Sequence, residues 1–236
     1  MTTTIAENYY TAHSTQLLKD LEKKLPYFKR VLNTEFPPDE VTRIIQQTRD
    51  EFRRLLPRLP DIGGRQNPLT ENLLASAWFL ALAQPLRQRG WSDDQIGDLI
   101  YRIAEVWVAS TPRWTAWLQG KLARTPLVKF LLKRVSRQSQ QRRYAADFVV
   151  QFVEGNQRDF DFGLDFTECA ICKLFQAEQS GGLAKHMCRI DYLTTSFRGI
   201  QLLRTGTIAN GASRCDFRYK QLPGGQRTPQ VITLYE

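Results

Sequence analysis

Apolar side chains recur every three or four positions through roughly the first 140 residues, which is the period of an amphipathic helix. This pattern predicts helices over 5–32, 37–56 and 72–89, a fourth from Ser92 until Pro112, and short ones over 118–122 and 127–137. Pro26 is expected to end or bend the first helix. The stretch 72–89 is apolar almost all round, so we expect it to be the core helix of this part.

Two short stretches fix the backbone around these helices. Ser92 is followed three residues later by Gln95, which is close to the capping box that starts a helix. Residues 57–68 combine two prolines with Gly63–Gly64 and Asn67–Pro68, and they predict a shaped loop instead of a regular element.

From Tyr144 onward the pattern changes to alternating β-branched and aromatic residues. It predicts strands over 147–155 and 160–166, helices over 168–179 and 183–194, and a hairpin of strands 199–207 and 212–219 turned at Asn210–Gly211. The final VITLYE is expected to add an edge strand. The fold class is therefore α+β, with a helical part over 1–143 and an α+β part over 144–236. No linker separates the two parts, and we favour one fused unit.

The formal charge of +9 comes from one segment of the 236-residue chain. Residues 106–146, the basic segment, contain nine Lys or Arg residues and no Asp or Glu. This segment is either a solvated helix face or a surface that meets an anionic substrate, an acidic partner or a membrane. A lid, or a route for an anionic or carrier-bound substrate, is a further interpretation. We expect no nucleic-acid partner, because Trp107, Trp114 and Trp117 cluster before the basic run and no nucleic-acid-binding motif is present.

The expected compartment follows from three absences in the sequence. The first residues lack a basic region followed by an apolar run, and the longest apolar stretch, 73–83, is too short to cross a bilayer. Four cysteines are too few for a disulfide scaffold, so we expect reduced thiols. We therefore expect a cytoplasmic protein without a transmembrane segment. The sequence leaves a homo-oligomer open.

Reactive side chains are concentrated in residues 161–219, which contain all four cysteines. Cys169 and Cys172 form a C-x-x-C pair at the start of a predicted helix. Cys188 lies on the next helix, with Asp191 one turn later on the same face. This stretch is where we expect the functional site.

Three kinds of chemistry fit these thiols. A metal site would use the C-x-x-C pair with His186 and Cys188, or all four thiols, but Cys215 has no close partner in the sequence. A redox pair would use C-x-x-C alone, and a catalytic thiol would act as a nucleophile near a helix end or a cation. We expect neither a metal nor a cofactor. A structural role as a small buried apolar residue is expected for at least Cys172.

Charged side chains near the cysteines are further candidates. Lys173 follows Cys169 by one helical turn and is suited to lowering the pKa of its thiol. His186 is two residues from the third cysteine, on the opposite side of the helix, so the two are not expected to pair. Arg204 and Arg218 are candidates to bind a substrate carboxylate through a bidentate fork, and exposed strand-edge cations are the alternative.

Several stretches of the chain together resemble the L-2-amino-thiazoline-4-carboxylic acid hydrolase family. They are DFGLDFTECAICKLF, the spaced Cys188 and Asp191, RTGTIANGASRCDFRY and, in the first half, LLPRLPDIGGRQNPLTENLL followed by LRQRGWSDDQIGDL. The resemblance covers roughly residues 5–220, although the basic segment has no counterpart in these motifs. The cysteine-containing half is similar, more faintly, to vinyl-4-reductase-type small-molecule-binding domains. The family motif positions fall on Asp165, Thr167, Glu168, Cys169, Lys173, Cys188, Asp191, Arg204, Thr207, Gly211, Cys215, Asp216 and Arg218, with Gly63, Gly64 and Asn67 from the loop.

The resemblance implies an enzyme that opens a cyclic amidine-type ring by adding water. Its substrate would be a small molecule with a carboxylate, and its product a carbamoyl cysteine. A relative acting on another small heterocycle in secondary metabolism fits the same motifs. The alternatives are a non-catalytic ligand-binding or sensor protein with a cysteine-bound zinc, and an adaptor that docks through the basic segment.

The roles that we carry over to individual residues are hypotheses. We expect Cys188 to be the nucleophile, with Cys169 as its rival, and Asp191 or Glu168 to carry protons or hold the amidinium. The carboxylate would be held by Arg204 or Arg218, and Gly63 and Gly64 would donate backbone N–H groups to the developing charge.

Overall fold

The computed structural model describes residues 8–123, 125–156 and 158–221. The first part is helical: α1 (Tyr9–Ala12), α2 (Ser14–Glu22), α3 (Leu25–Leu32), α4 (Pro38–Leu55), α5 (Thr70–Arg87), α6 (Asp93–Ala109), α7 (Arg113–Leu122) and α8 (Pro126–Ser139), with 3-10 turns η1 (Leu56–Arg58) and η2 (Gly64–Gln66). The second part contains β1 (Val149–Glu154), β2 (Phe162–Glu168), α9 (Ala170–Ala177), α10 (Gly181–Phe197), β3 (Ile200–Leu203), η3 (Ile208–Asn210) and β4 (Cys215–Gln221). The predicted α+β class is confirmed.

The four strands form one antiparallel sheet in the order β1-β2-β4-β3. Side chains alternate between its two faces, so Cys215, Phe217 and Tyr219 of β4 lie on one face and Asp216 and Arg218 on the other. We call the face with Cys215, which α10 covers, the inner face, and the opposite one the outer face. This alternation decides which candidate residues can meet.

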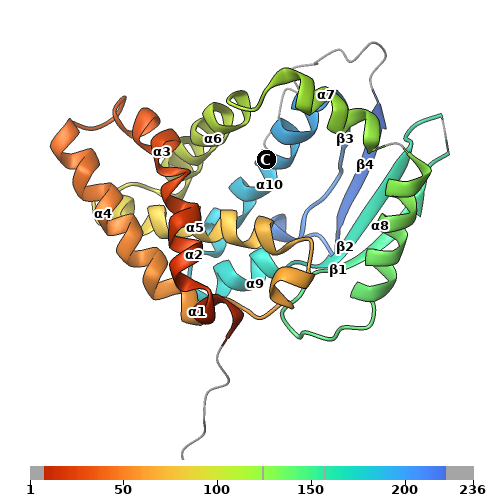
Figure 1. Ribbon diagram of the computed structural model, residues 1–236, viewed down its shortest axis with the longest axis horizontal. Helices are drawn as coiled ribbons and strands as arrows, with labels where there is room; N and C mark the ends of the chain where they lie inside the picture. Colours follow the sequence, from red (N-terminus) through yellow and green to blue (C-terminus); the bar gives the residue numbers. More distant parts are fainter. Residues whose placement is uncertain (1–7, 124, 157, 222–236) are drawn as a thin grey trace, which may run out of the picture.

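Figure 1 shows α1–α6 on one side of the molecule and the sheet with α8 on the other, with α9 and α10 between them. The core is built around α5, which is buried along nearly its whole length. One buried cluster joins Phe28 and Phe52 of the first part to Phe175 and Met187 of the second. In the described part of the chain, no helix is both long and apolar enough to span a membrane.

The predicted single helix over 5–32 is wrong, because within the described residues it is divided into α1, α2 and α3. Proline has no N–H group to donate within a helix, but it is tolerated in a first turn. Pro26 is accordingly the second residue of α3. The chain leaves the helical ladder at Lys23 and Lys24 and restarts, so Pro26 begins a helix instead of ending one.

The predicted two-residue hairpin at Asn210–Gly211 is also wrong. Strands β3 and β4 do pair, but residues 204–214 connect them, and Gly211 closes the short η3 turn with φ +85°. The ladder stops at Leu203 because Asp216 of β4 binds the backbone N–H groups of Thr205 and Gly206. The predicted strand VITLYE lies outside the described residues.

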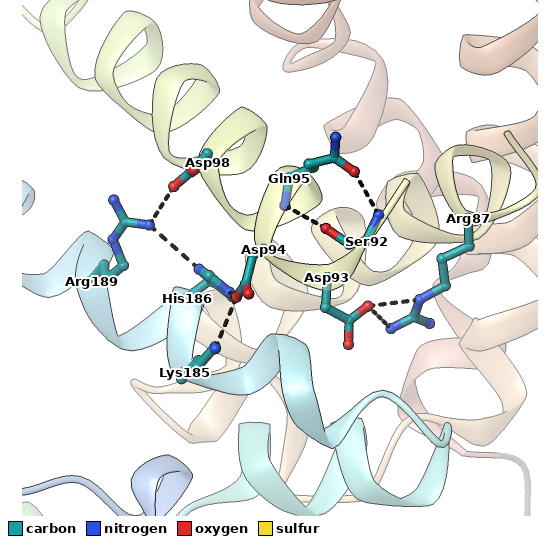
Figure 2. Close-up of polar contacts among 9 residues, drawn as sticks. All are labelled: Arg87, Ser92, Asp93, Asp94, Gln95, Asp98, Lys185, His186 and Arg189. Atoms are coloured by element: carbon teal, nitrogen blue, oxygen red, sulfur yellow. Dashed lines mark hydrogen bonds and ion pairs between the residues drawn. The ribbon is translucent and has the colours of Figure 1, made fainter. Parts of the chain in front are cut away.

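Helix α10 is fixed against α6 by a group of polar contacts (Figure 2). Asp94 accepts a hydrogen bond from His186 at 3.0 Å and pairs with Lys185, while Arg189 pairs with Asp98. The helices approach closely at Gly97, where an added Cβ would lie 2.1 Å from the His186 ring. The predicted capping box of Ser92 and Gln95 starts α6. These contacts set the position of the face of α10 that carries Cys188 and Asp191.

Candidate active site

Cys169 occupies the N-cap position of α9 with an extended backbone. Its sulfur accepts hydrogen bonds from the Cys172 thiol and from the backbone N–H groups of Cys172 and Ile171, and these bonds lower the pKa of Cys169 below its usual range. The side chain is partly exposed, whereas Cys172 is buried and its pKa is strongly raised by its bond to Cys169. Free helix N–H groups stabilise negative charge, so Cys169 is placed to be a thiolate.

The other two cysteines are held as neutral thiols. Burial, and then the nearby Asp191 carboxylate, raise the pKa of Cys188 far above its usual range. Burial also raises the pKa of Cys215 to about 11, although its sulfur accepts a hydrogen bond from the Ile208 N–H at 3.2 Å. The pKa values of Cys188 and Cys215 are therefore raised, in contrast to that of Cys169.

Asp191 of α10 pairs with Arg204, which directly follows β3. The guanidinium donates to the carboxylate at 2.9 Å and to the Cys188 carbonyl at 2.8 Å. It lies over the rings of Tyr192 and Phe217 at 4.8 and 4.9 Å. We call this ion pair on the inner face the inner pair.

The two members of the inner pair differ in their access to water. The Arg204 side chain is 3% exposed, whereas that of Asp191 is 41% exposed. Burial of the carboxyl nevertheless raises the pKa of Asp191, against the opposing effect of Arg204. Asp191 is therefore closely surrounded by protein while one side of it remains accessible to solvent.

Several proton-carrying groups surround this carboxylate. The negative charge of Asp191 raises the pKa of Cys188, Cys215 and Tyr219 and opposes the lowering at Cys169, so all four side chains lie within electrostatic range of it. Burial is the main cause that raises the pKa of Tyr219 well above its ordinary value. The inner face thus gathers one stabilised thiol, one accessible carboxyl and one guanidinium.

The structure places three other candidates on the outer face. Asp165 of β2 accepts a hydrogen bond from Arg218 at 2.6 Å, and Arg214 lies 3.6 Å away. Asp216 binds the loop after β3 by accepting from the Thr205 hydroxyl at 2.6 Å. We call Asp165 and Arg218 the outer pair. The sheet separates these residues from the inner pair.

The rest of the RTGTIANGASRC motif shapes the loop between β3 and β4. The buried Thr207 hydroxyl accepts from the Asn210 N–H at 3.2 Å and caps η3. Gly211 supplies the left-handed backbone that ends this turn. The loop is therefore folded by its own side chains, and it fixes the position at which Arg204 enters the inner face.

Glu168 and Lys173 flank Cys169 and form an ion pair with each other, and Arg142 also contacts Glu168. Lys173 donates to the Ala145 carbonyl at 2.8 Å, and burial lowers its pKa. These contacts join α9 to the chain that precedes β1. The causes that most lower the pKa of Cys169 are the Cys172 thiol and the helix N–H groups. The negative charge of Cys169 in turn raises the pKa of Lys173, so these two side chains lie within electrostatic range of each other.

The loop of residues 57–68, which we call the glycine loop, lies apart from the inner pair. Gly63 and Gly64 have φ of +96° and +53°, and the Gly63 N–H donates to Asp61. Asn67 holds the loop by donating to the Ile62 carbonyl at 2.6 Å and to Asp147 at 2.8 Å. The loop forms one wall of a pocket of about 290 Å³, whose lining includes none of the four cysteines.

Two residues of the inner face were missed by reasoning from the sequence. Tyr219 lies two and four residues after Phe217 and Cys215, so strand alternation carried the signal that would have placed it beside Cys215. Tyr192 carried no such signal, because its contact with Arg204 depends on how α10 crosses the sheet.

Metal ligation has no support from the geometry of the described residues. Among them, no three His, Cys, Asp or Glu side chains are arranged to hold a metal ion. His186, which the metal hypothesis includes, is instead bound to Asp94.

Comparison with known proteins identifies the family. Residues 71–219 match the sequence model of the L-2-amino-thiazoline-4-carboxylic acid hydrolase family. The matched range contains the basic segment and every candidate of the inner and outer faces, and it begins just after the glycine loop. Searches of curated proteins and of solved structures found no match. Since the match covers more than half of the chain, the protein belongs to the L-2-amino-thiazoline-4-carboxylic acid hydrolase family.

Proposed function

We propose that this protein hydrolyses the ring of L-2-amino-thiazoline-4-carboxylate, or of a similar small cyclic amidine with a carboxylate, and that Cys169 is the nucleophile. The family name supports the hydrolase class and this kind of substrate. The observation that carries the choice of nucleophile is the position of the Cys169 sulfur at the N-terminus of α9, in electrostatic range of Asp191.

Cys169 fits this role better than Cys188, which the sequence favoured. A thiolate attacks and a thiol does not, so the nucleophile must be able to ionise near neutral pH. Of the four cysteines, Cys169 alone has a lowered pKa. Burial and the Asp191 carboxylate oppose the ionisation of Cys188, and Arg204 only partly offsets them.

The inner pair matches the two charges of the proposed substrate. A protonated aminothiazoline ring is an amidinium cation, and the molecule also carries a carboxylate. Asp191 would hold the amidinium, and Arg204 would bind the carboxylate through its planar fork. The ion pair between Asp191 and Arg204 would be replaced by two ion pairs with the substrate. No charge would then be left unpaired.

The bond that breaks follows from the product. We take the product to be N-carbamoyl cysteine, which keeps both nitrogens on the central carbon, so hydrolysis breaks the ring C–S bond. The Cys169 thiolate would add to this carbon, and the ring sulfur would leave. Asp191 would carry one amidinium proton to the departing sulfur, which becomes the thiol of the product.

Water completes the reaction. After the first step the carbon is joined to the Cys169 sulfur as an isothiourea-type adduct that retains every atom of the substrate. Water would then add to the same carbon, with Asp191 accepting a proton, and the C–S bond to Cys169 would break. The Cys169 thiolate is regenerated, and one water has been added overall.

Turnover measured by mass spectrometry tests this proposal. The purified protein is incubated with L-2-amino-thiazoline-4-carboxylate, and we expect the substrate to gain the mass of one water. Cys169→Ser should reduce kcat by about a thousandfold or more, because a serine hydroxyl is not ionised near neutral pH. In the matched variant Cys188→Ser, kcat should stay within about threefold of the value for the parent protein.

Three outcomes would contradict the proposal. Full activity of Cys169→Ser would remove this thiol from the mechanism. Loss of activity in Cys188→Ser, with an unchanged unfolding transition, would return the nucleophile to Cys188. No turnover of this substrate by the parent protein would reject the substrate assignment.

A further inference from the structure

The basic segment presents an unusual surface. Of the nine large apolar side chains that are exposed among the described residues, seven lie on α7 and α8. We call them the α7–α8 patch: Trp114, Trp117, Leu118, Leu122, Leu127, Phe130 and Leu131. Such a concentration on a water-soluble surface marks an interaction site.

Helix α7 turns its apolar side away from the protein. Its buried residues are the small Ala116 and Gly120, and an added Cβ at Gly120 would lie 2.0 Å from the Arg198 carbonyl at the end of α10. The large side chains therefore cannot face inward, and Trp114 on the opposite side is 68% exposed. The orientation of the helix is fixed by close packing.

Helix α8, which follows α7 in the chain, also has an exposed apolar side. The Ser136 hydroxyl donates to the Val150 carbonyl at 2.8 Å and accepts from the Phe152 N–H at 2.7 Å, so this side of α8 covers the edge of the sheet. The opposite side exposes Leu127 and Phe130. In Figure 1, α7 lies at the top of the molecule and α8 runs down its right side.

The charged residues of the segment that carries the patch are all of one sign, and one of them, Lys133, pairs with Glu154 of β1. Residues 106–146 carry nine cations and no acid. Arg134 and Arg137 are exposed on α8, one and two turns after Phe130, and the Lys121 ammonium lies 3.9 Å from the centre of the Trp117 ring. A surface of Trp, Phe and Leu edged by Lys and Arg is the composition of helices that lie in the interface of an anionic bilayer.

We propose that the α7–α8 patch docks the protein on an anionic membrane surface. A second copy is a poor occupant, because its exposed Lys121, Arg134 and Arg137 would face the same cations. A peptide or helix partner is bound in a groove, whereas Trp114 and Leu127 stand out from convex helices with exposures of 68% and 66%. A bilayer needs no groove, and α7 and α8 would lie in its plane. This inference is independent of the proposed hydrolysis.

Vesicle flotation with the full chain tests the proposal. We expect binding to vesicles of phosphatidylcholine with phosphatidylglycerol, and much weaker binding to phosphatidylcholine alone. Trp114→Ser/Phe130→Ser should lower the partition coefficient by more than about tenfold, because two aromatic rings no longer enter the bilayer. Arg134→Glu/Arg137→Glu should also lower the partition coefficient by more than about tenfold, because each basic residue near the surface is attracted to the anionic lipid.

Matched controls separate the patch from general effects. Arg53→Glu/Arg54→Glu changes the net charge equally on the exposed side of α4, and Leu203→Ser removes an exposed apolar side chain outside the patch. Both should bind vesicles as the parent does. An unchanged unfolding temperature confirms that each variant is folded.

Two results would overturn the proposal. One is the absence of binding to anionic vesicles. The other is binding that charge reversal abolishes but Trp114→Ser/Phe130→Ser leaves unchanged. That result would indicate a purely electrostatic surface, suited to an acidic protein instead of a bilayer.

Discussion

One sheet carries two carboxylate–guanidinium pairs, and they are built differently. The outer pair of Asp165 and Arg218 bridges neighbouring strands, and Arg218 also donates to the Phe217 carbonyl beside it. The inner pair of Asp191 and Arg204 joins a helix to a loop, beside a thiol at a helix N-terminus. The same two functional groups thus bind strands together on one face and meet reactive side chains on the other.

The difference lies in the surroundings of each carboxylate. On the inner face burial raises the pKa of Asp191 above the ordinary aspartate value, which favours a role in proton transfer. On the outer face, the Arg218 side chain lies against Gly163, where an added Cβ would come within 2.9 Å of it. We infer that the outer pair stabilises strand pairing and that the inner pair does the chemistry.

The largest contrast is expected from the two aspartates. Asp191→Asn removes the proposed proton carrier, so kcat should fall by about a thousandfold, which is typical of a lost general acid–base. Asp165→Asn should leave kcat within about threefold. Equal losses in both variants, measured by substrate turnover, would abolish the distinction between the pairs.

The two arginines should show the same contrast to a smaller extent. Arg204→Lys keeps the charge but removes the planar fork, so kcat/KM should fall by about a hundredfold, mainly through KM. Arg218→Lys should change kcat/KM little and cost about 1 kcal/mol of unfolding free energy or less. A larger loss of kcat/KM in Arg218→Lys would place the carboxylate site on the outer face.

A substitution where α6 contacts α10 should displace the inner pair, which α10 carries, and leave the outer pair in place. Gly97→Ala pushes a methyl group into the His186 ring, so we expect a loss of about 1–3 kcal/mol in urea denaturation and reduced activity. Gly181→Ala, at the start of α10, meets only Gln176 at 3.9 Å and should be neutral. Unaltered stability in Gly97→Ala would show that this contact does not position α10.

The smallest effect should be a dependence of stability on pH. Burial lowers the pKa of His186 in the folded protein, so protonation favours the unfolded chain. The stabilisation is complete above about pH 6.5, the ordinary histidine value, and is lost as the pH falls from there towards the folded pKa. Denaturation midpoints should show this loss in the parent and in the exposed control His13→Gln, but not in His186→Gln. An identical pH profile in all three would exclude His186 as its source.

Local chemistry predicted part of this site. The sequence predicted the C-x-x-C pair at the start of a helix over 168–179, and the helix begins two residues later, with Cys169 as its N-cap. One helical turn placed Cys188 and Asp191 on one face. Strand alternation separates Cys215 from Asp216 and Arg218. The sequence could not decide whether Arg204 or Arg218 would bind the substrate carboxylate, because this depends on the loop that turns Arg204 towards α10.

The choice between the thiols could not be predicted either. Cys188 and Cys169 are both predicted on helices near charged residues, and both are partly exposed. Only tertiary packing places Asp191 beside the first, and the Cys172 thiol and free helix N–H groups beside the second. The break at Lys23 and Lys24 has a similar origin, since a proline pattern fits both an end and a start.

Trapping the covalent adduct tests the central claim most directly. Turnover is quenched with acid, the protein is digested, and its cysteine peptides are analysed by mass spectrometry. Nucleophilic attack by Cys169 predicts an adduct with the full mass of the substrate on the peptide that contains Cys169, and none on the peptide with Cys188. An adduct on Cys188, or continued turnover without any adduct in Cys169→Ser, would contradict it.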